Sequence, residues 1–314
     1  MRKRFVAFGV LVIAFLIGYK IFAPNERPQR IRIATGGESG VYYAYGNALA
    51  DILERRMNIP VVTIQSGGSV DNIRILRSGR ADIAFAQNDI MAYAHEGINI
   101  FSTEGGFKDF SAAVCLYPEA CQIVARRDIA GIPDLKGRRV SLGDEGSGTE
   151  LNALQILGAY GISYADVDVD HLSFGASVTA FREGKIDAFF CTAGVPTPAI
   201  SELSADGEVR LLNIGDAHAR TLIRQYPYYS RQIIPSGVYP GMDEEAETVA
   251  VKASLAVSDK LSPQVVADLL KILFESRAEI AKISAEAALL NDKSALDGMS
   301  IPMHPGAEKY FFDR

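Results

Sequence analysis

The sequence predicts an α/β fold of two similar lobes. Strand-like and helix-like segments alternate along the chain, and the order strand, Gly/Ser loop, helix, strand, Gly/Ser loop, helix, strand occurs twice. The first repeat covers residues 31–89 and the second covers residues 138–194. Such units form parallel sheets with right-handed crossovers. Because ligands bind outside the carboxyl ends of parallel strands, two facing units predict a cleft between two lobes.

Matching residues support the repeat. They occur in the same order in both halves: Gly40 and Gly148 lie 108 residues apart, as do the pairs Ser69-Val70 and Ser177-Val178, and the third strands begin with Gly79-Arg80-Ala81-Asp82 and Gly184-Lys185-Ile186-Asp187, 105 residues apart. Agreement at three places in one order indicates two copies of one supersecondary unit.

The first repeat starts with the strand "IRIA" and the loop "TGGESG". Apolar residues then recur at helical spacing from Val41 to Leu53. The β-branched strand "VVTI" follows, and then the loop "QSGGS" and a short helix. Ser69 is a candidate N-cap of this helix and Gly79 is its C-terminal stop. The segment "RADIAFAQND" completes the unit as a third strand.

The second repeat has the strand "RRVSL", a Gly/Ser loop and the helical stripe of "TELNALQILGAYG". "DVDVD" is expected to be a solvated strand edge, because its spacing fails as a calcium loop. The loop "SFGAS", a helix ending at Gly184 and the strand "KIDAFFCTAG" follow. Further on, "TVAVKASLAVS" predicts a long strand, and a helix should start at Ser262 with Pro263 in its first position.

Residues 1–26 form a segment separate from the fold. "MRKR" is a basic n-region, "FVAFGVLVIAFLIG" is an unbroken apolar run, and a polar stretch containing Pro24 follows. This pattern predicts a signal peptide or an N-terminal membrane anchor, and therefore a periplasmic or other extracytoplasmic location. Ala23 is the only obvious small residue for cleavage, so both the cleaved and the anchored form stay open.

Bulk composition excludes several classes. The net charge is −6 and the basic residues are scattered, so nucleic-acid binding is not expected. The four histidines show no metal-ligand spacing and no C-x-x-C occurs, so no metal site is expected. The glycine loops lack the lysine of a P-loop and the G-x-G-x-x-G of a dinucleotide site. No cofactor is expected.

The Gly/Ser loops are the candidate ligand sites. Glycines let a ligand approach the backbone, and the N–H groups at a following helix N-terminus attract an anion. Simple turns and caps remain alternatives for each loop; Ser147 with Glu150, for example, fits a capping box. The third strands end with Gln87 and Asp89 in one repeat and with Cys191 and Gly194 in the other, so all four should point towards the cleft.

Three cysteines are present. Cys115 and Cys121 flank "LYPEA" symmetrically, and a turn at Pro118 would let them form a disulfide in an oxidising compartment. Two separate buried thiols fit the sequence as well, because geometry rather than spacing decides. Cys191 is left over in either case.

Several stretches together resemble one family. "TGGESGVYYAYGNALA", "GGSVDNIRILRSGRADIAFAQND", "LYPEA", "LKGRRVSLGDEGSGTELNA", "GKIDAFFCTAGVPTPAI", "IRQYPYYSRQIIPSGVYPG" and "IPMHPGAEKYF" are similar to the TAXI family. Its members are the extracytoplasmic solute-binding proteins of TRAP transporters, which are driven by an ion gradient. The likeness runs in order from about residue 30 to the end of the chain.

The resemblance implies a type II periplasmic-binding-protein fold with crossover strands near 115–122 and 248–258. Lobe 1 would then comprise 27–118 and the returning C-terminal part 253–314, and lobe 2 would comprise 119–252. It further implies a monomeric receptor, not an enzyme, that carries a small organic anion such as glutamate or a 2-oxo or dicarboxylic acid to a TRAP-type permease. The implied ligand-binding residues are Gly37, Ser39, Tyr42, Ser66, Gly68, Gln87, Ser147, Gly148, Thr149 and Gly194.

Two departures from the family pattern concern charge. Glu38 and Ser39 replace Thr and Gly of the usual first loop, and Asp144-Glu145 precede the second loop in place of a neutral residue and Pro. Added carboxylates repel an anion unless they point away, and they could favour a ligand that bears an amine. A sensory or ABC-type receptor on the same fold is the nearest alternative. A hydrolase or transferase using Ser39, Ser147 or Cys191 is a more distant one, since no histidine lies near them in sequence.

Overall fold

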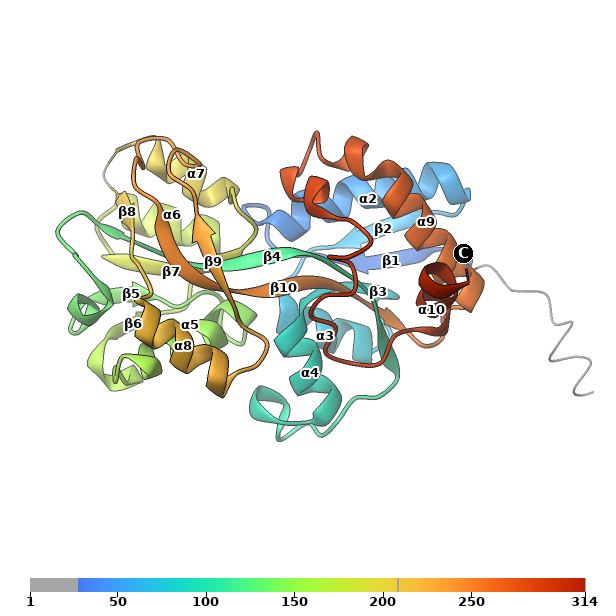
Figure 1. Ribbon diagram of the computed structural model, residues 1–314, viewed down its shortest axis with the longest axis horizontal. Helices are drawn as coiled ribbons and strands as arrows, with labels where there is room; N and C mark the ends of the chain where they lie inside the picture. Colours follow the sequence, from blue (N-terminus) through green and yellow to red (C-terminus); the bar gives the residue numbers. More distant parts are fainter. Residues whose placement is uncertain (1–27, 208, 314) are drawn as a thin grey trace, which may run out of the picture.

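A computed structural model describes residues 28–207 and 209–313, so the predicted signal or anchor segment 1–26 lies outside the described residues. Two α/β lobes lie side by side, and two long antiparallel strands, β4 (Phe110–Arg126) and β10 (Ala246–Ser258), run through the middle of the molecule from one lobe to the other (Figure 1). Among residues 28–207 and 209–313, no helix combines the length and the apolar character that a bilayer crossing requires.

The first repeat forms the parallel sheet predicted for it. Strands β1 (Ile31–Ala34), β2 (Val61–Ile64) and β3 (Ile83–Gln87) lie in the order β2-β1-β3. Helices α2 (Val41–Met57) and α3 (Ser69–Arg77) connect them. The apolar stripe of α2 is buried as its spacing predicts, and Gly79 follows α3 with a positive φ that glycine tolerates.

The second repeat has the same order. Strands β5 (Arg139–Ser141), β6 (Asp168–Asp170) and β7 (Ala188–Ala193) are parallel and lie as β6-β5-β7, and helices α5 (Gly148–Ala159) and α6 (Phe174–Arg182) connect them. β6 is an edge strand whose aspartates are exposed, as the sequence suggested. The two units of the sequence repeat are therefore two copies of one βαβαβ arrangement.

An ion pair is repeated with the fold. Arg32 donates to both carboxylate oxygens of Asp82, at 3.0 and 2.7 Å, and to the carbonyl of Gly79. In the second repeat, Arg139 donates to both oxygens of Asp187, at 3.1 and 2.6 Å, and to the carbonyl of Gly184. In each unit the bidentate pair ties the first strand to the start of the third, opposite the end that carries the Gly/Ser loops.

The central strands join the two sheets into one. β10 pairs with β3 on one side and with β4 on the other, and β4 pairs with β7, so the hydrogen-bonded order is β2-β1-β3-β10-β4-β7-β5-β6. Two further strands lie off this path: β8 (Val209–Leu211) pairs with β4, and β9 (Ser230–Ile234) pairs with β10. The predicted lobe boundaries, after residues 118 and 252, fall inside β4 and β10 and stay predictions.

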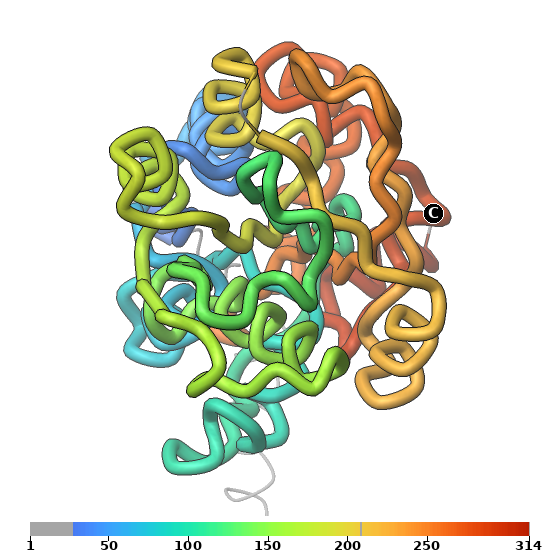
Figure 2. The backbone as a smooth tube through the Cα atoms, turned by 90° about the vertical axis from the view of Figure 1, so that its left-hand side faces the viewer, coloured from blue at the N-terminus to red at the C-terminus, as the bar shows by residue number. Residues whose placement is uncertain are grey.

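The remaining elements cover the sheets. After β10 the chain returns to the first lobe as α9 (Pro263–Ile280), which packs against α2 and has the predicted Ser262 cap and Pro263 start. In Figure 2 the second lobe faces the viewer, with the blue and red parts of the first lobe behind it. The other elements are α4 (Asn88–Glu96), η1 (Asn99–Phe101), η2 (Ile132–Leu135), η3 (Tyr164–Asp166), α7 (Pro198–Ser204), α8 (Asp216–Gln225), η4 (Ala285–Leu289) and α10 (Pro305–Phe312).

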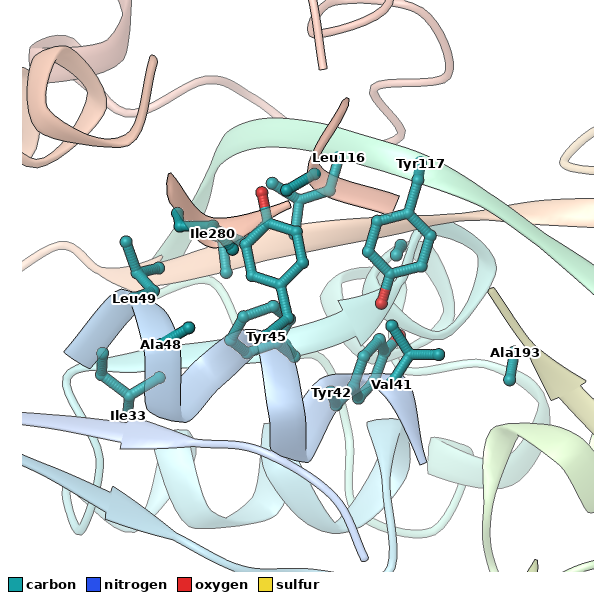
Figure 3. Packing of buried hydrophobic residues seen from close by; sticks show 14 of the residues in the cluster. Ile33, Val41, Tyr42, Tyr45, Ala48, Leu49, Leu116, Tyr117, Ala193 and Ile280 are labelled. Atoms are coloured by element: carbon teal, nitrogen blue, oxygen red, sulfur yellow. The ribbon is translucent and has the colours of Figure 1, made fainter. Parts of the chain in front are cut away.

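Aromatic rings fill the core where α2 meets the central strands. Tyr45 lies with its ring centroid 5.7 Å from that of Phe85 and 5.9 Å from that of Tyr117. Figure 3 shows Tyr117 of β4 with its hydroxyl pointing towards the start of α2, near Val41. The hydroxyls of Tyr45 and Tyr117 are buried and have no hydrogen-bond partner. This packing fixes the start of α2 against the strand that crosses between the lobes.

The predicted turn at Pro118 does not occur, and the disulfide that depended on it does not form. Residues 110–126 form one continuous strand, with Cys115 and Cys121 both inside it. Six residues of extended strand separate their Cα atoms by about 20 Å, whereas a disulfide needs roughly 4.4–6.8 Å. Both thiols are free and buried, as is that of Cys191. The alternative of separate buried thiols is therefore the correct one.

Candidate functional site

A cavity of about 550 Å³ lies between the lobes. Its walls are the Gly/Ser loops and first turns of α2, α3, α5 and α6, together with the end of β7 and one residue each from β3 and β4. The lining residues are Gly36, Gly37, Glu38, Ser39, Gly40, Val41, Tyr42, Gln65, Ser66, Gly67, Gly68, Ser69, Gln87, Glu119, Asp144, Ser147, Gly148, Thr149, Ser173, Phe174, Gly175, Thr192 and Ala193. The repeat places two helix starts on each side of the cavity.

Helix N-termini give the cavity a positive potential. Helices α2 and α3 begin after Gly40 and Gly68 and have no side-chain cap. The N–H groups of their first turns are therefore available to a ligand in the cavity. In the second repeat Ser147 accepts from the Glu150 N–H at 3.1 Å, and Ser173 accepts from the N–H of Ala176. All four helix dipoles favour an anionic group in the cavity.

Asn72 holds the two loops of the first repeat together. Its amide nitrogen donates to the carbonyl of Phe85 at 2.7 Å and to the carbonyl of Thr35. Its amide oxygen accepts from Ser66 Oγ at 2.6 Å, and Ser66 Oγ in turn accepts from the Gly68 N–H at 3.0 Å. This fully buried side chain fixes the loop before α2 relative to the loop before α3, so the anion-facing backbone is held in place before a ligand arrives.

Carboxylates oppose this positive potential. Glu38, Glu119 and Asp144 belong to the lining, which includes no Lys, Arg or His from the described part of the chain. Glu119, in β4, is 2% exposed, and Tyr42 Oη donates to its Oε2 at 2.7 Å. Burial raises the pKa of Glu119 to about 8. Burial also raises the pKa of Asp144.

The lobes touch across the cavity. The amide oxygen of Gln87, at the end of β3, lies so close to Gly148 of α5 that a Cβ there would stand 2.0 Å from it. Ser39 approaches Gly175 of α6 in the same way, because a Cβ added to Gly175 would stand 2.8 Å from the hydroxyl oxygen of Ser39. A larger residue at either helix start would therefore have to displace a side-chain end from the first lobe, Gln87 at Gly148 and Ser39 at Gly175.

The structure gathers most of the predicted ligand residues around this cavity. Gly194 is the exception: it faces η4, where a Cβ would stand 2.6 Å from Cγ of Glu286. The lining brings together the other nine: Gly37, Ser39, Tyr42, Ser66, Gly68, Gln87, Ser147, Gly148 and Thr149. Their contact with a ligand stays a prediction.

Sequence reasoning missed Glu119, Phe174 and Thr192 as lining residues. Glu119 could have been found, because it is the only carboxylate between Phe110 and Arg126, where the chain is largely apolar. Phe174 and Thr192 gave no such signal.

Two of the three candidate nucleophiles are occupied or inaccessible, whereas Ser39 lies half-buried in the cavity lining. Ser147 caps α5, and burial raises the pKa of the Cys191 thiol well above its usual value. The imidazole of His171 lies 3.6 Å from a carboxylate oxygen of Glu150, and Ser147 Oγ accepts from the Glu150 N–H instead of from a histidine. Among residues 28–207 and 209–313, no group of three His, Cys, Asp or Glu residues is placed to hold a metal ion.

Two lobes, two crossing strands and a cavity between facing helix starts define the fold class, which is that of the type II periplasmic binding proteins. The chain belongs to the NMT1-like family, whose model matches residues 33–313.

Solved structures agree on the fold. PhnD1 from Prochlorococcus marinus, in complex with methylphosphonate, has a TM-score of 0.57 at 10% identity, over 83% of this chain and 90% of that one. The alkanesulfonate-binding protein SsuA from Xanthomonas axonopodis pv. citri, bound to MOPS, has a TM-score of 0.51 at 18% identity, over 92% of this chain and 85% of that one. The ligand-binding component of an ABC-type import system from Staphylococcus aureus, with zinc bound, has a TM-score of 0.51 at 14% identity, over 83% of this chain and 84% of that one.

Proposed function

We propose that this protein is the extracytoplasmic solute receptor of a TRAP-type (TAXI) transporter, and that it delivers a small organic anion to a membrane permease. The observation that carries the proposal is the convergence of four helix N-termini on one cavity of about 550 Å³. A cavity of this size suits a metabolite rather than a polymer. Five of the seven sequence stretches similar to the TAXI family contribute residues to the lining of this cavity, which supports that assignment within the fold class.

Capture follows from the architecture. The anionic group of the ligand binds to the open N-termini of α2 and α3, and the second lobe closes over it with the starts of α5 and α6. Bending of β4 and β10 moves one lobe relative to the other, as in hinge closure of binding proteins. Contacts such as Gln87 with Gly148 then form between lobes, and the closed surface is what the permease recognises.

The proposal includes no chemical step. A nucleophile needs a base within hydrogen-bond reach. Ser147 caps α5, the Cys191 thiol is buried, and the cavity lining that contains Ser39 includes no described Lys or His. We expect every bound solute to be recovered unchanged after release, which mass spectrometry of the ligand before and after incubation checks. Recovery of a converted product would favour the hydrolase or transferase alternative.

An ABC-type receptor is the second candidate, because one of the structures that share this fold is a component of an ABC-type import system. The driving force separates the two. Reconstituted with a TRAP-type permease, the receptor should support uptake that an ion gradient drives without ATP. Uptake that requires ATP would replace the TRAP assignment by the ABC one and leave the receptor function intact.

Ligand binding itself is tested by a thermal-shift screen of the purified protein with amino acids, dicarboxylates, 2-oxo acids and sugars. A ligand at about 100 times its Kd adds roughly 2.7 kcal/mol to the free energy of unfolding, which raises Tm by several degrees. We expect shifts with organic acids. A response to sugars alone, or to nothing in the panel, would contradict the organic-anion assignment.

A further inference from the structure

Glu119 occupies a place that the anion-binding loops do not explain. It lies on the crossing strand β4 rather than on a helix start, and its carboxylate reaches the cavity from a position that is 2% exposed. Tyr42 holds one of its oxygens at 2.7 Å. A buried carboxylate is costly unless it is paired or protonated, and no described Lys, Arg or His lines the cavity to pair with it.

A second buried group in the same lining has no hydrogen-bond partner. Gln87 is 3% exposed, and its amide oxygen accepts no hydrogen bond. The cavity wall thus offers two buried acceptors, a carboxylate and an amide oxygen, whereas its helix N-termini offer donors. A plain anion satisfies only the donors. A ligand that carries both an anionic group and a hydrogen-bond-donating cation satisfies both sets.

We infer that Glu119, positioned by Tyr42 and assisted by Gln87, is the specificity-determining residue that accepts a protonated amine of the ligand. This inference rests on the proposed function and narrows its ligand class to amine-bearing organic anions.

Binding then exchanges one proton. In the empty protein the Glu119 carboxyl is protonated near neutral pH, because burial raises its pKa to about 8. When the ammonium group arrives, its N–H donates to the carboxylate and the proton of Glu119 leaves to solvent. The charge balances: a neutral acid and a cation give an ion pair and one released proton.

The groups around Glu119 bear on this exchange from several elements. Tyr42 of α2 lowers its pKa by a hydrogen bond, whereas Asp89 of α4 and Glu286 of η4 raise it by their charge. Tyr117 on β4 itself and the buried thiol of Cys191 on β7 also face it and are neutral. Burial raises the pKa of Asp89 to about 6, so Asp89 titrates below the range in which Glu119 does.

The sign of the pH dependence separates the two ligand types. An amine-bearing ligand binds the ionised form of Glu119, so its Kd should fall up to about tenfold per unit as the pH rises from 6.5 towards 8, and then level off. An amine-free acid binds the protonated form, so its Kd should be flat up to about pH 8 and rise above it. Opposite slopes are therefore expected from two ligands of nearly the same shape.

The test is calorimetric titration of the purified protein with L-glutamate and with glutarate, which differ in the amine, and with other amino acids paired with their amine-free analogues. Each titration is run from pH 6.5 to 8.5 in two buffers of different ionisation enthalpy. We expect tighter binding of the amine-bearing member of a pair and release of close to one proton per ligand at pH 7.

Variants locate the effect at Glu119. Glu119→Gln should weaken amine-ligand binding by about 30-fold or more and abolish both the pH slope and the proton release. Glu145→Gln removes an exposed carboxylate that lies outside the lining and should keep the slope. Tyr42→Phe removes the hydrogen bond that lowers the pKa of Glu119, so the break in the pH profile should move upward even if Glu119→Gln does not fold.

The outcomes separate the two proposals. If amine-free acids bind as tightly as their amine-bearing partners, with no proton released, the role of Glu119 is overturned while the organic-anion receptor stands. If no acid of either kind binds at any pH, the proposed function falls, and the inference falls with it.

Discussion

The helices that face the cavity begin differently in the two repeats. In the first, α2 and α3 start after Gly40 and Gly68 without a side-chain cap, whereas in the second, α5 and α6 start with the serine caps Ser147 and Ser173. At the opposite end of the sheet the repeats agree, down to the bidentate Arg–Asp pair. The scaffold therefore occurs twice, and its cavity-facing ends differ: the helices of the first repeat have no side-chain cap, whereas those of the second have serine caps.

The Arg–Asp pairs should give the largest effects, and equal ones. Asp187→Ala and Asp82→Ala each remove the acceptor of a bidentate arginine and of a backbone N–H, so we expect each to cost about 2–3 kcal/mol of unfolding free energy. Urea denaturation of the two variants beside the wild type measures this. If only one of the two variants lost unfolding free energy, the two Arg–Asp pairs would not stabilise their lobes in the same way.

The second-repeat pair also predicts a pH dependence. The Arg139 hydrogen bond lowers the pKa of Asp187 in the folded protein, so its contribution to stability is full above the unfolded pKa of about 3.9 and is lost as the pH falls through the lower folded value. Denaturation of Asp187→Asn and wild type at pH 5 and at successively lower pH should show the difference between them shrinking. A constant difference would contradict the pairing.

Gly148 and Gly40 occupy equivalent positions but face different neighbours. A Cβ on Gly148 would overlap the amide oxygen of Gln87 from the other lobe, whereas on Gly40 it would stand 3.3 Å from the carbonyl of Gly37 and 3.7 Å from the Phe174 ring. We expect Gly148→Ala to weaken ligand binding about tenfold or more because it obstructs closure, and Gly40→Ala to weaken it less. Calorimetry with the best ligand of the screen decides; the reverse order would mean that these contacts do not form on closure.

The caps give the smallest effect and sharpen the comparison between the repeats. Ser147→Ala and Ser173→Ala should each cost about 1 kcal/mol of unfolding free energy, because each leaves a first-turn N–H without its acceptor. Ser39→Ala, in the corresponding loop of the first repeat, removes no cap and should change stability by less than about 0.5 kcal/mol. Equal losses in all three would show that the first repeat has a cap after all.

The repeat made the fold predictable. Local patterns place the strands, the Gly/Ser loops and the helices, and right-handed connections fix the sheet order within each unit. The pairing of β10 between β3 and β4 joins segments more than a hundred residues apart, and only the resemblance to a family anticipated the crossing strands. The prediction of a turn at Pro118 was wrong because β4 continues through this proline, which lies opposite Lys252 within the pairing of β4 with β10.

The site was predictable where it consists of loops. Glycine and serine before a helix have a physical reason to be there, which is why Gly37, Ser66, Gly68 and Gly148 could be named as lining candidates. The sequence shows Glu119 as a lone carboxylate in an apolar stretch, but it does not show the burial of Glu119 or its contact with Tyr42, which lies 77 residues away in the chain. Gly194 looked like its neighbours in sequence, but the chain turns it towards η4.

The position of β10 in the sheet has a consequence for synthesis. β3 pairs with β1 on one side, but its other side is completed only by residues 253–257 of β10. A nascent chain therefore holds an open sheet edge in its first lobe until most of its length has been made, and α9, which packs on α2, arrives later still. The order of the chain keeps the first lobe from finishing before the second has been translated.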